Sequence, residues 1–149
     1  MSGAMLDFGP GRYRFFLPMR WIVAVERECG DKSIVAMYEE MSAGIGIEQD
    51  TDAARFLANG GVRIKDVYEV IRCAAIGGGE AEINGEVVKV SAIDAKRLVD
   101  EYVDGRPYAE HVPVAWKILN DALLGDPPAP DLAAQKKSGQ DTSLSNAVT

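Results

Sequence analysis

The chain has few of the residues on which many enzymes depend. Its 149 residues include one histidine, His111, and two cysteines, Cys29 and Cys73. A single histidine excludes a metal site built on two histidines, and the cysteines lie too far apart in the sequence to form a CxxC motif. Free cysteine is usually buried as a small apolar side chain. We therefore expect two buried thiols in a protein of the reducing cytoplasm.

Long apolar runs and basic clusters are also absent from the sequence. No apolar stretch approaches the roughly 18 residues of a membrane-spanning helix, and the N-terminus has no apolar signal core, so we expect neither a membrane span nor export. The 23 acidic and 16 basic residues give a net charge of −7. Because phosphate binding needs clustered Lys and Arg, we expect no nucleic acid and no anionic membrane as a partner.

The composition that remains is that of an ordinary globular protein. Apolar residues make up 47% of the chain and charged residues 26%, and a chain of this length normally forms one domain. The Gly-rich start, residues 1–11, is expected to be a flexible leader. The segment 126–149 contains three prolines and no apolar period, so we expect a disordered tail. The sequence therefore predicts one domain over residues 12–125.

The stretch 66–79, DVYEVIRCAAIGGG, carries the strongest helix signal. Glu69 falls on the polar face of this helix, and Asp66 suits the positive end of the helix dipole. Three glycines close the stretch, and glycine enters the left-handed backbone region without a steric penalty. The pattern predicts a central helix that Gly77 ends and Gly78–Gly79 turn away from. The face that it buries consists of Val67, Val70, Ile71 and Ala74.

The remaining elements are shorter. A strand is expected over residues 12–17 and a hairpin over 81–90, where Asn84-Gly85 is a strong turn signal. A lone hairpin is marginally stable, so it should lean on the helices or pair with the first strand. Residues 43–47 fit either a short extended piece or a loop. Further helices are expected over 18–30, over 31–41 with Asp31 as N-cap, over 52–61, over 91–105 with Ser91 as N-cap, and over 107–123.

Taken together, these patterns predict a mainly α fold. It is a compact bundle of about five helices with a short N-terminal strand and a small β-hairpin. One point stays open in the last helix, because proline removes a backbone donor and clashes one turn back. Either the helix kinks at Pro113, or its regular part begins at Val112.

No group of residues assembles a recognisable catalytic site. His111 is interpreted as a packed or rim histidine, because a general base needs a positioned partner. Cys73 has no accompanying motif, and Gly77–Gly79 follow a helix, whereas phosphate loops precede one. The acidic pairs Glu39-Glu40 and Asp100-Glu101 are interpreted as solvated helix faces. We assign no catalytic, cofactor-binding or metal-binding residue, and we expect no cofactor and no enzymatic activity.

Three segments together resemble the tail assembly proteins of gene transfer agents and related phage tails. They are YRFFLPMRWIVAVERECGDKSIVAMYE, with Glu26 and Gly30; DVYEVIRCAAIGGG; and PVAWKILNDALLG, with Trp116, Leu119 and Gly125. Each segment alone is a plain amphipathic helix, but their order and spacing are distinctive. The resemblance covers about residues 12–125. The hairpin region 80–90 and the segment 126–149 lie outside the shared core.

This family is described as a tail assembly chaperone and also as a tail tube protein. The resemblance implies a non-enzymatic protein of the host cytoplasm that binds the tape-measure protein while the tail tube assembles. It carries no catalytic residues to transfer. The alternative is a structural tail component retained in the virion. Tail tube subunits are built around sheets, so the expectation of only about three short strands counts against that alternative. Self-association and contact with tail tube subunits stay open.

Overall fold

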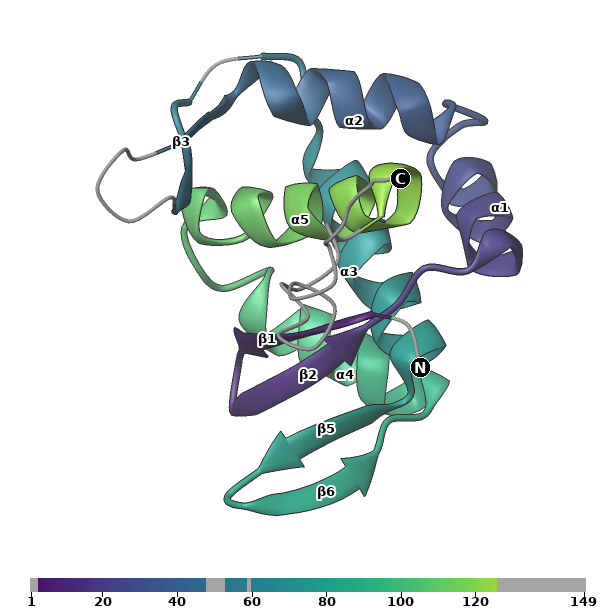
Figure 1. Cartoon of the computed structure of the whole chain (residues 1–149), viewed down its shortest axis with the longest axis vertical. Helices are drawn as coiled ribbons and strands as arrows, with labels where there is room; N and C mark the ends of the chain where they lie inside the picture. Colours follow the sequence, from purple (N-terminus) through teal and green to yellow (C-terminus); the bar gives the residue numbers. More distant parts are fainter. Residues whose placement is uncertain (1–2, 48–52, 59, 126–149) are drawn as a thin grey trace, which may run out of the picture.

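The computed structural model describes residues 3–47, 53–58 and 60–125. Within these residues the chain forms six strands and five α-helices (Figure 1). The strands are β1 (Ala4–Phe8), β2 (Gly11–Phe15), β3 (Ile45–Ile47), β4 (Ala54–Phe56), β5 (Glu80–Ile83) and β6 (Glu86–Lys89). The helices are α1 (Met19–Glu28), α2 (Ile34–Ala43), α3 (Ile64–Gly78), α4 (Ala92–Tyr102) and α5 (Val112–Leu124), with a short 3-10 helix, η1 (Tyr108–Glu110), before α5.

The fold is mixed α/β, so the expected mainly α bundle is wrong. Four antiparallel strands form one sheet in the order β1-β2-β5-β6, and β3 pairs with β4 in a separate two-stranded sheet. The four-stranded sheet lies at one end of the molecule and α2 at the other (Figure 1). Five helices are present as expected, but the sheet makes up a layer of its own rather than an appendage to the helices.

The first strand is the element that the sequence concealed. Residues 4–8 pair along their whole length with β2, so the expected flexible leader is wrong for this part of residues 1–11. Leu6 and Phe8 lie on the face that packs against the core, and Phe8 is 7% exposed. The alternation of apolar and other side chains in AMLDF is a real strand signal. This signal spans only five residues and is followed by Gly9-Pro10, a pair typical of loops, so the sequence was interpreted as a loop there.

Helix α3 is central, as predicted, and its four apolar positions are fully buried. The predicted stop at Gly77 is wrong, because Gly77 and Gly78 both belong to the helix and Gly79 supplies the left-handed cap at φ 73°. A Cβ atom on Gly77 would overlap the carbonyl oxygen of Phe16, and one on Gly78 would overlap that of Arg14. The glycines therefore allow the last turn of α3 to lie directly on the backbone at the end of β2.

Backbone hydrogen bonds join this last turn to the sheet. The Phe16 N–H donates to the Ala74 carbonyl oxygen at 3.0 Å, and the Val90 N–H donates to the Gly79 carbonyl oxygen at 2.9 Å. The carbonyl groups in the last turn of a helix have no partner within the helix. The Val90 N–H thus satisfies the Gly79 carbonyl just past the helix, and the Phe16 N–H ties the last turn of α3 to the segment that follows β2.

Two acidic residues of α3 are also buried, so the expected position of Glu69 on a polar, solvated face is wrong. Glu69 is 3% exposed and accepts hydrogen bonds from Arg72 at 2.6 and 3.0 Å. Asp66 is 1% exposed and accepts from the Lys32 ammonium at 2.8 Å, and Glu40 accepts from the same ammonium at 2.8 Å. Burial lowers the pKa of Lys32, but its hydrogen bonds to the two carboxylates outweigh burial and raise it. Other elements thus surround α3 on its polar side as well.

Two further expectations need correction. The N-cap of α2 is Ser33, whose hydroxyl accepts from the Ala36 N–H, whereas Asp31 sits in the preceding turn at φ 60°. The helix expected over residues 52–61 is wrong, because residues 54–56 form β4 and pair with β3. The pairing also shows that residues 45–47, in the segment left open between strand and loop, form a strand.

The other local signals are confirmed. Asn84 and Gly85 form the β5–β6 turn with φ 52° and 82°, and the hairpin pairs with β2. Ser91 and Asp94 form a capping box on α4. Helix α5 begins at Val112, with Pro113 in its first turn, so the second of the two alternatives for this proline is correct. The expected disordered tail, 126–149, lies outside the described residues.

The close contact between α3 and β2 predicts an unusual response to a Gly→Ala substitution. Inside an ordinary helix this change stabilises by about 1 kcal/mol. Gly78→Ala should instead lower the free energy of unfolding by about 2 kcal/mol or more, because the new methyl group meets backbone rather than a movable side chain. Urea denaturation measures the change. Gly79→Ala is the control, since its Cβ would have space and should cost only about 1 kcal/mol for the left-handed backbone. Stabilisation by Gly78→Ala would contradict the proposed contact.

A second prediction concerns the buried carboxylate of α3. Glu69→Ala should lower the free energy of unfolding by about 2–3 kcal/mol, because it leaves the partly buried Arg72 guanidinium without its partner. Glu39→Ala, at an exposed position of α2, removes the same charge and should change stability by less than about 0.5 kcal/mol. Equal effects in thermal and urea melts would show that Glu69 is solvated.

Candidate functional site

The two faces of the four-stranded sheet differ in chemistry. One face carries Tyr13, Phe15 and Ala81, which are buried in the core. Side chains alternate between faces along a strand, and directly paired residues of antiparallel strands share a face. The opposite face, which we call the charged face, therefore carries two residues from each strand. They are Met5 and Asp7, Arg12 and Arg14, Glu80 and Glu82, and Val87 and Lys89.

These eight residues form two rows across the strands. In one row the Arg12 guanidinium forms two ion pairs: its Nε lies 3.5 Å from Asp7 Oδ1, and its Nη1 lies 3.9 Å from Glu82 Oε1. In the other row Arg14 lies 3.0 Å from Glu80. The rows continue to Val87 and Lys89 on β6, which pair with Glu82 and Glu80 respectively. Along the sheet, the strands of the charged face are therefore acidic (β1), basic (β2), acidic (β5) and basic (β6).

The sheet ends in two edges that pair with no other strand among the described residues. On β6, Val87 is 72% exposed and Lys89 is exposed without an ion pair in the described part of the chain. The Val90 N–H donates to the Gly79 carbonyl oxygen, on the side of β5. Along a strand, the N–H and C=O groups of successive residues point alternately to one side and the other. The N–H and C=O groups of Val87 and Lys89 therefore point outward. On β1, Asp7 has a side chain that is 90% exposed.

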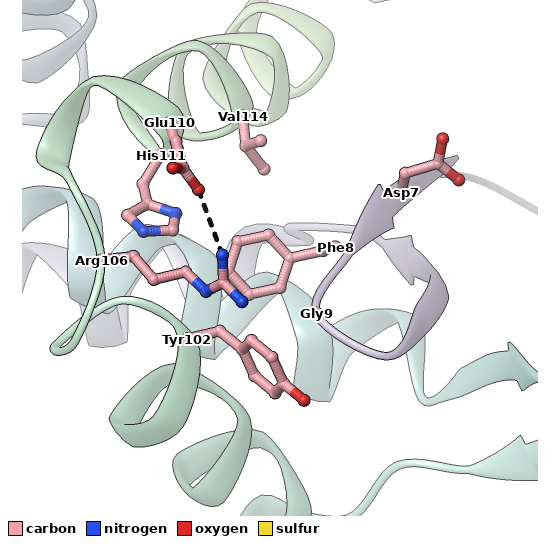
Figure 2. Close-up of a pocket in the computed structure, with 8 residues that line it drawn as sticks. All are labelled: Asp7, Phe8, Gly9, Tyr102, Arg106, Glu110, His111 and Val114. Carbon is pink, nitrogen blue, oxygen red and sulfur yellow. Dashed lines mark ion pairs between the residues drawn. The ribbon is translucent and has the colours of Figure 1, made fainter.

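A pocket of about 260 Å³ lies between β1, α4 and the start of α5 (Figure 2). Arg106 lies between Tyr102 and Glu110, 5.6 Å from the centre of the Tyr102 ring and 3.8 Å from a Glu110 oxygen. Asp7, at the rim, points away from the other side chains (Figure 2). His111 also lines the pocket, but it is only 3% exposed.

His111 is packed, as the sequence indicated. Its ring centre lies 5.6 Å from that of Phe8, and neither ring nitrogen has a hydrogen-bond partner among the described residues. Burial lowers the pKa of His111, which keeps the imidazole neutral near pH 7. A general base would have to accept a proton from a group within hydrogen-bond reach. The buried ring is therefore arranged for packing on β1 rather than for proton transfer.

The remaining residues singled out in the sequence are structural. Cys29 and Cys73 are buried free thiols, and burial raises their pKa values to about 12 and about 11, so both stay protonated. Trp116 donates to the Ser42 hydroxyl at 3.0 Å and stacks beside Tyr38. Asp100 accepts from Lys96 and from the Tyr68 hydroxyl at the surface of α4.

No group of three or more His, Cys, Asp or Glu side chains among the described residues could hold a metal ion. No helix in the same part of the chain is long and apolar enough to cross a membrane.

The charged face was not anticipated from the sequence. Its signal is present in the two segments RYR and EAE, where like charges recur at every second position around a buried residue. This period of two is typical of a strand with one wet face. Only the pairing of β2 with β5, from distant parts of the chain, shows that the two charge patterns lie side by side.

Comparison with known proteins identifies the family to which the chain is similar. Residues 2–125 match the model of a protein family described as "Phage tail tube protein, GTA-gp10". The match includes both edges of the sheet and all five helices. No curated protein sequence matches the chain, and neither does any solved structure.

The packing of His111 predicts a pH dependence. In the folded protein the pKa of His111 lies below its ordinary value of 6.5. The unfolded chain therefore binds more protons than the folded protein as the pH falls. This lowers the stability of the folded state. Between about pH 7 and pH 5, the wild-type protein should lose stability relative to a His111→Phe variant. Urea melts of both proteins across this range measure the difference. Parallel curves would show that the imidazole is solvated in the folded protein.

Proposed function

The chain belongs to the family of phage tail tube proteins of the GTA-gp10 type, and we propose that it is a structural component of such a tail, retained in the assembled particle. The proposed role is non-enzymatic and depends on contact between protein surfaces. The protein is made in the host cytoplasm and enters the tail as assembly proceeds. The observation that carries this proposal is the family match, whose description names a tail tube protein.

The fold removes the main argument against this role. Few strands were expected, and a protein with few strands is poorly suited to a sheet-based tail component. The chain instead forms a four-stranded antiparallel sheet with two open edges. Subunits that build an extended object need two different surfaces that fit each other, because a self-complementary surface closes after two copies. Two unlike sheet edges on one small domain supply such surfaces.

The tail assembly chaperone remains the competing function. That role calls for a surface that covers an amphipathic helix of the tape-measure protein. Large exposed hydrophobic residues lie on several elements, such as Val35 on α2 and Ile93 on α4, and Met19 and Val23 lie one turn apart on α1. Exposed apolar residues in such small numbers are normal for a soluble protein. They favour neither function, whereas the family description favours the structural component.

Quantitative mass spectrometry of purified particles tests the proposed function. Peptides from this chain should occur in a fixed ratio to those of the other tail proteins. The ratio should persist after the particles are washed in high salt and purified on a density gradient. Particles from a host that lacks the gene provide the control for carry-over from the lysate.

The opposite result has a clear form. If the chain is absent from washed particles but co-purifies with the tape-measure protein before assembly, the structural role is wrong and the chaperone role replaces it. If the chain is present at far below one copy per tail, it is not a structural component of the tail.

A further inference from the structure

A groove of about 490 Å³ lies between α1 and the C-terminal end of α5, which lie side by side (Figure 1). Most of the side chains that line it are apolar. They include Phe16, just before α1, Met19 and Ile22 on α1, and Ile118 and Ala122 on α5. An apolar groove between two helices is the geometry in which a third, amphipathic helix docks.

The exposed side of α1 extends the apolar surface of the groove. Met19 is 74% exposed, and Val23, one turn later, is 50% exposed. Successive residues of an α-helix are rotated by about 100°, so the order around α1 can be derived from the sequence. Starting at the groove, it runs through Ile22, Met19 and Val23 to Arg27 and Arg20. An apolar strip therefore lies beside the groove and a basic strip beyond it. We call Met19, Arg20, Val23 and Arg27 together the α1 face.

The two arginines of the α1 face are exposed, and neither forms an ion pair with another residue in the described part of the chain. The acidic groups nearby are already engaged. Glu26, on the groove side of α1, accepts from the first backbone N–H of α2 at 2.9 Å. Asp121, on the α5 wall, is 15% exposed and accepts from Lys117 at 2.9 Å. Arg20 and Arg27 are thus available cations on a chain whose net charge is −7.

From this arrangement we infer that the groove and the α1 face bind an amphipathic, acidic helix of another protein. Apolar side chains of that helix enter the groove, and its acidic side chains lie against Arg20 and Arg27. The two arginines are seven residues apart, which corresponds to about 10 Å along the axis of α1. Acidic residues seven positions apart on the partner helix have the same spacing. This inference goes beyond the proposed structural role, which assigns no partner to α1.

Charge selects this occupant over two others. A basic helix would place its Lys or Arg side chains against the two arginines, which is unfavourable. A second copy of the chain, docked through its own α1 face, would bring two pairs of arginines together and is opposed for the same reason. An acidic helix pairs both arginines, and a carboxylate accepts two parallel hydrogen bonds from one guanidinium.

Two synthetic peptides of about 20 residues, each with a fluorescent label, test the charge preference. Both carry Leu on one face of an amphipathic helix, and the flanking positions are Glu in one peptide and Lys in the other. Fluorescence anisotropy with the full-length protein should show that the Glu peptide binds at least tenfold more tightly than the Lys peptide. The variant R20E/R27E should reverse this preference. Arg97→Glu, at an exposed position of α4, is the matched control and should leave the preference unchanged.

A second pair of variants tests the apolar part of the site. Met19→Ser should weaken binding of the Glu peptide by about tenfold, because Met19 becomes buried against the peptide. Ile93→Ser, at a position of α4 that is 70% exposed, is the control and should leave the affinity unchanged. Both side chains are largely exposed in the free protein. The two variants should therefore keep the far-UV circular dichroism and the urea midpoint of the wild type.

Three results would overturn the inference. The first is no binding of the Glu peptide at the highest soluble protein concentration. The second is equal binding of the two peptides that R20E/R27E leaves unchanged. The third is self-association of the wild type in sedimentation velocity that Met19→Ser abolishes, because the groove would then hold a second copy. None of these measurements depends on whether the chain is found in washed particles, so the proposed function is judged on its own test.

Discussion

The structure depends on one close contact, in which the last turn of α3 lies on the backbone at the end of β2. Gly77 and Gly78 make it possible, because any side chain at either position would meet a carbonyl oxygen. The Phe16 N–H then reaches the Ala74 carbonyl, so the contact is a hydrogen bond between helix and strand segment as well as a packing contact. A backbone-to-backbone contact of this kind fixes both the distance and the orientation of α3 relative to β2, since no side chain lies between them that could adjust.

Much of the fold follows from that constraint. The chain leaves α3 through Gly79 straight into β5, and β5 pairs with β2, so the helix and the hairpin share one anchor. With α3 fixed against the sheet, α1, α4 and α5 pack around its sides. Only a narrow stripe of the helix, from Ile64 and Lys65 to the partly buried Tyr68 and Arg72, is left to solvent. The carboxyl groups of Asp66 and Glu69 are consequently enclosed, and Lys32 and Arg72 lie within hydrogen-bond distance of them.

The sequence predicted features whose physics is local. Asn84-Gly85 requires left-handed backbone at two positions, which defines a hairpin turn without reference to the rest of the chain. The capping box at Ser91 is likewise a short-range arrangement. Glu69 could not be placed, because helical periodicity assumes one buried face and this helix has neighbours on both. The role of Gly77 depends on a strand some 60 residues earlier in the chain, so a terminator was the natural interpretation of three glycines.

The charged face illustrates the same limit. Its ion pairs involve exposed side chains, such as Asp7 at 90% and Arg12 at 54%, and pairs of this type each add little to the stability of one domain. The period of two in RYR and EAE indicates a strand with one wet face, and that signal is local. The register that places Arg14 beside Glu80 joins residues 66 positions apart, so no local pattern could predict which charges meet.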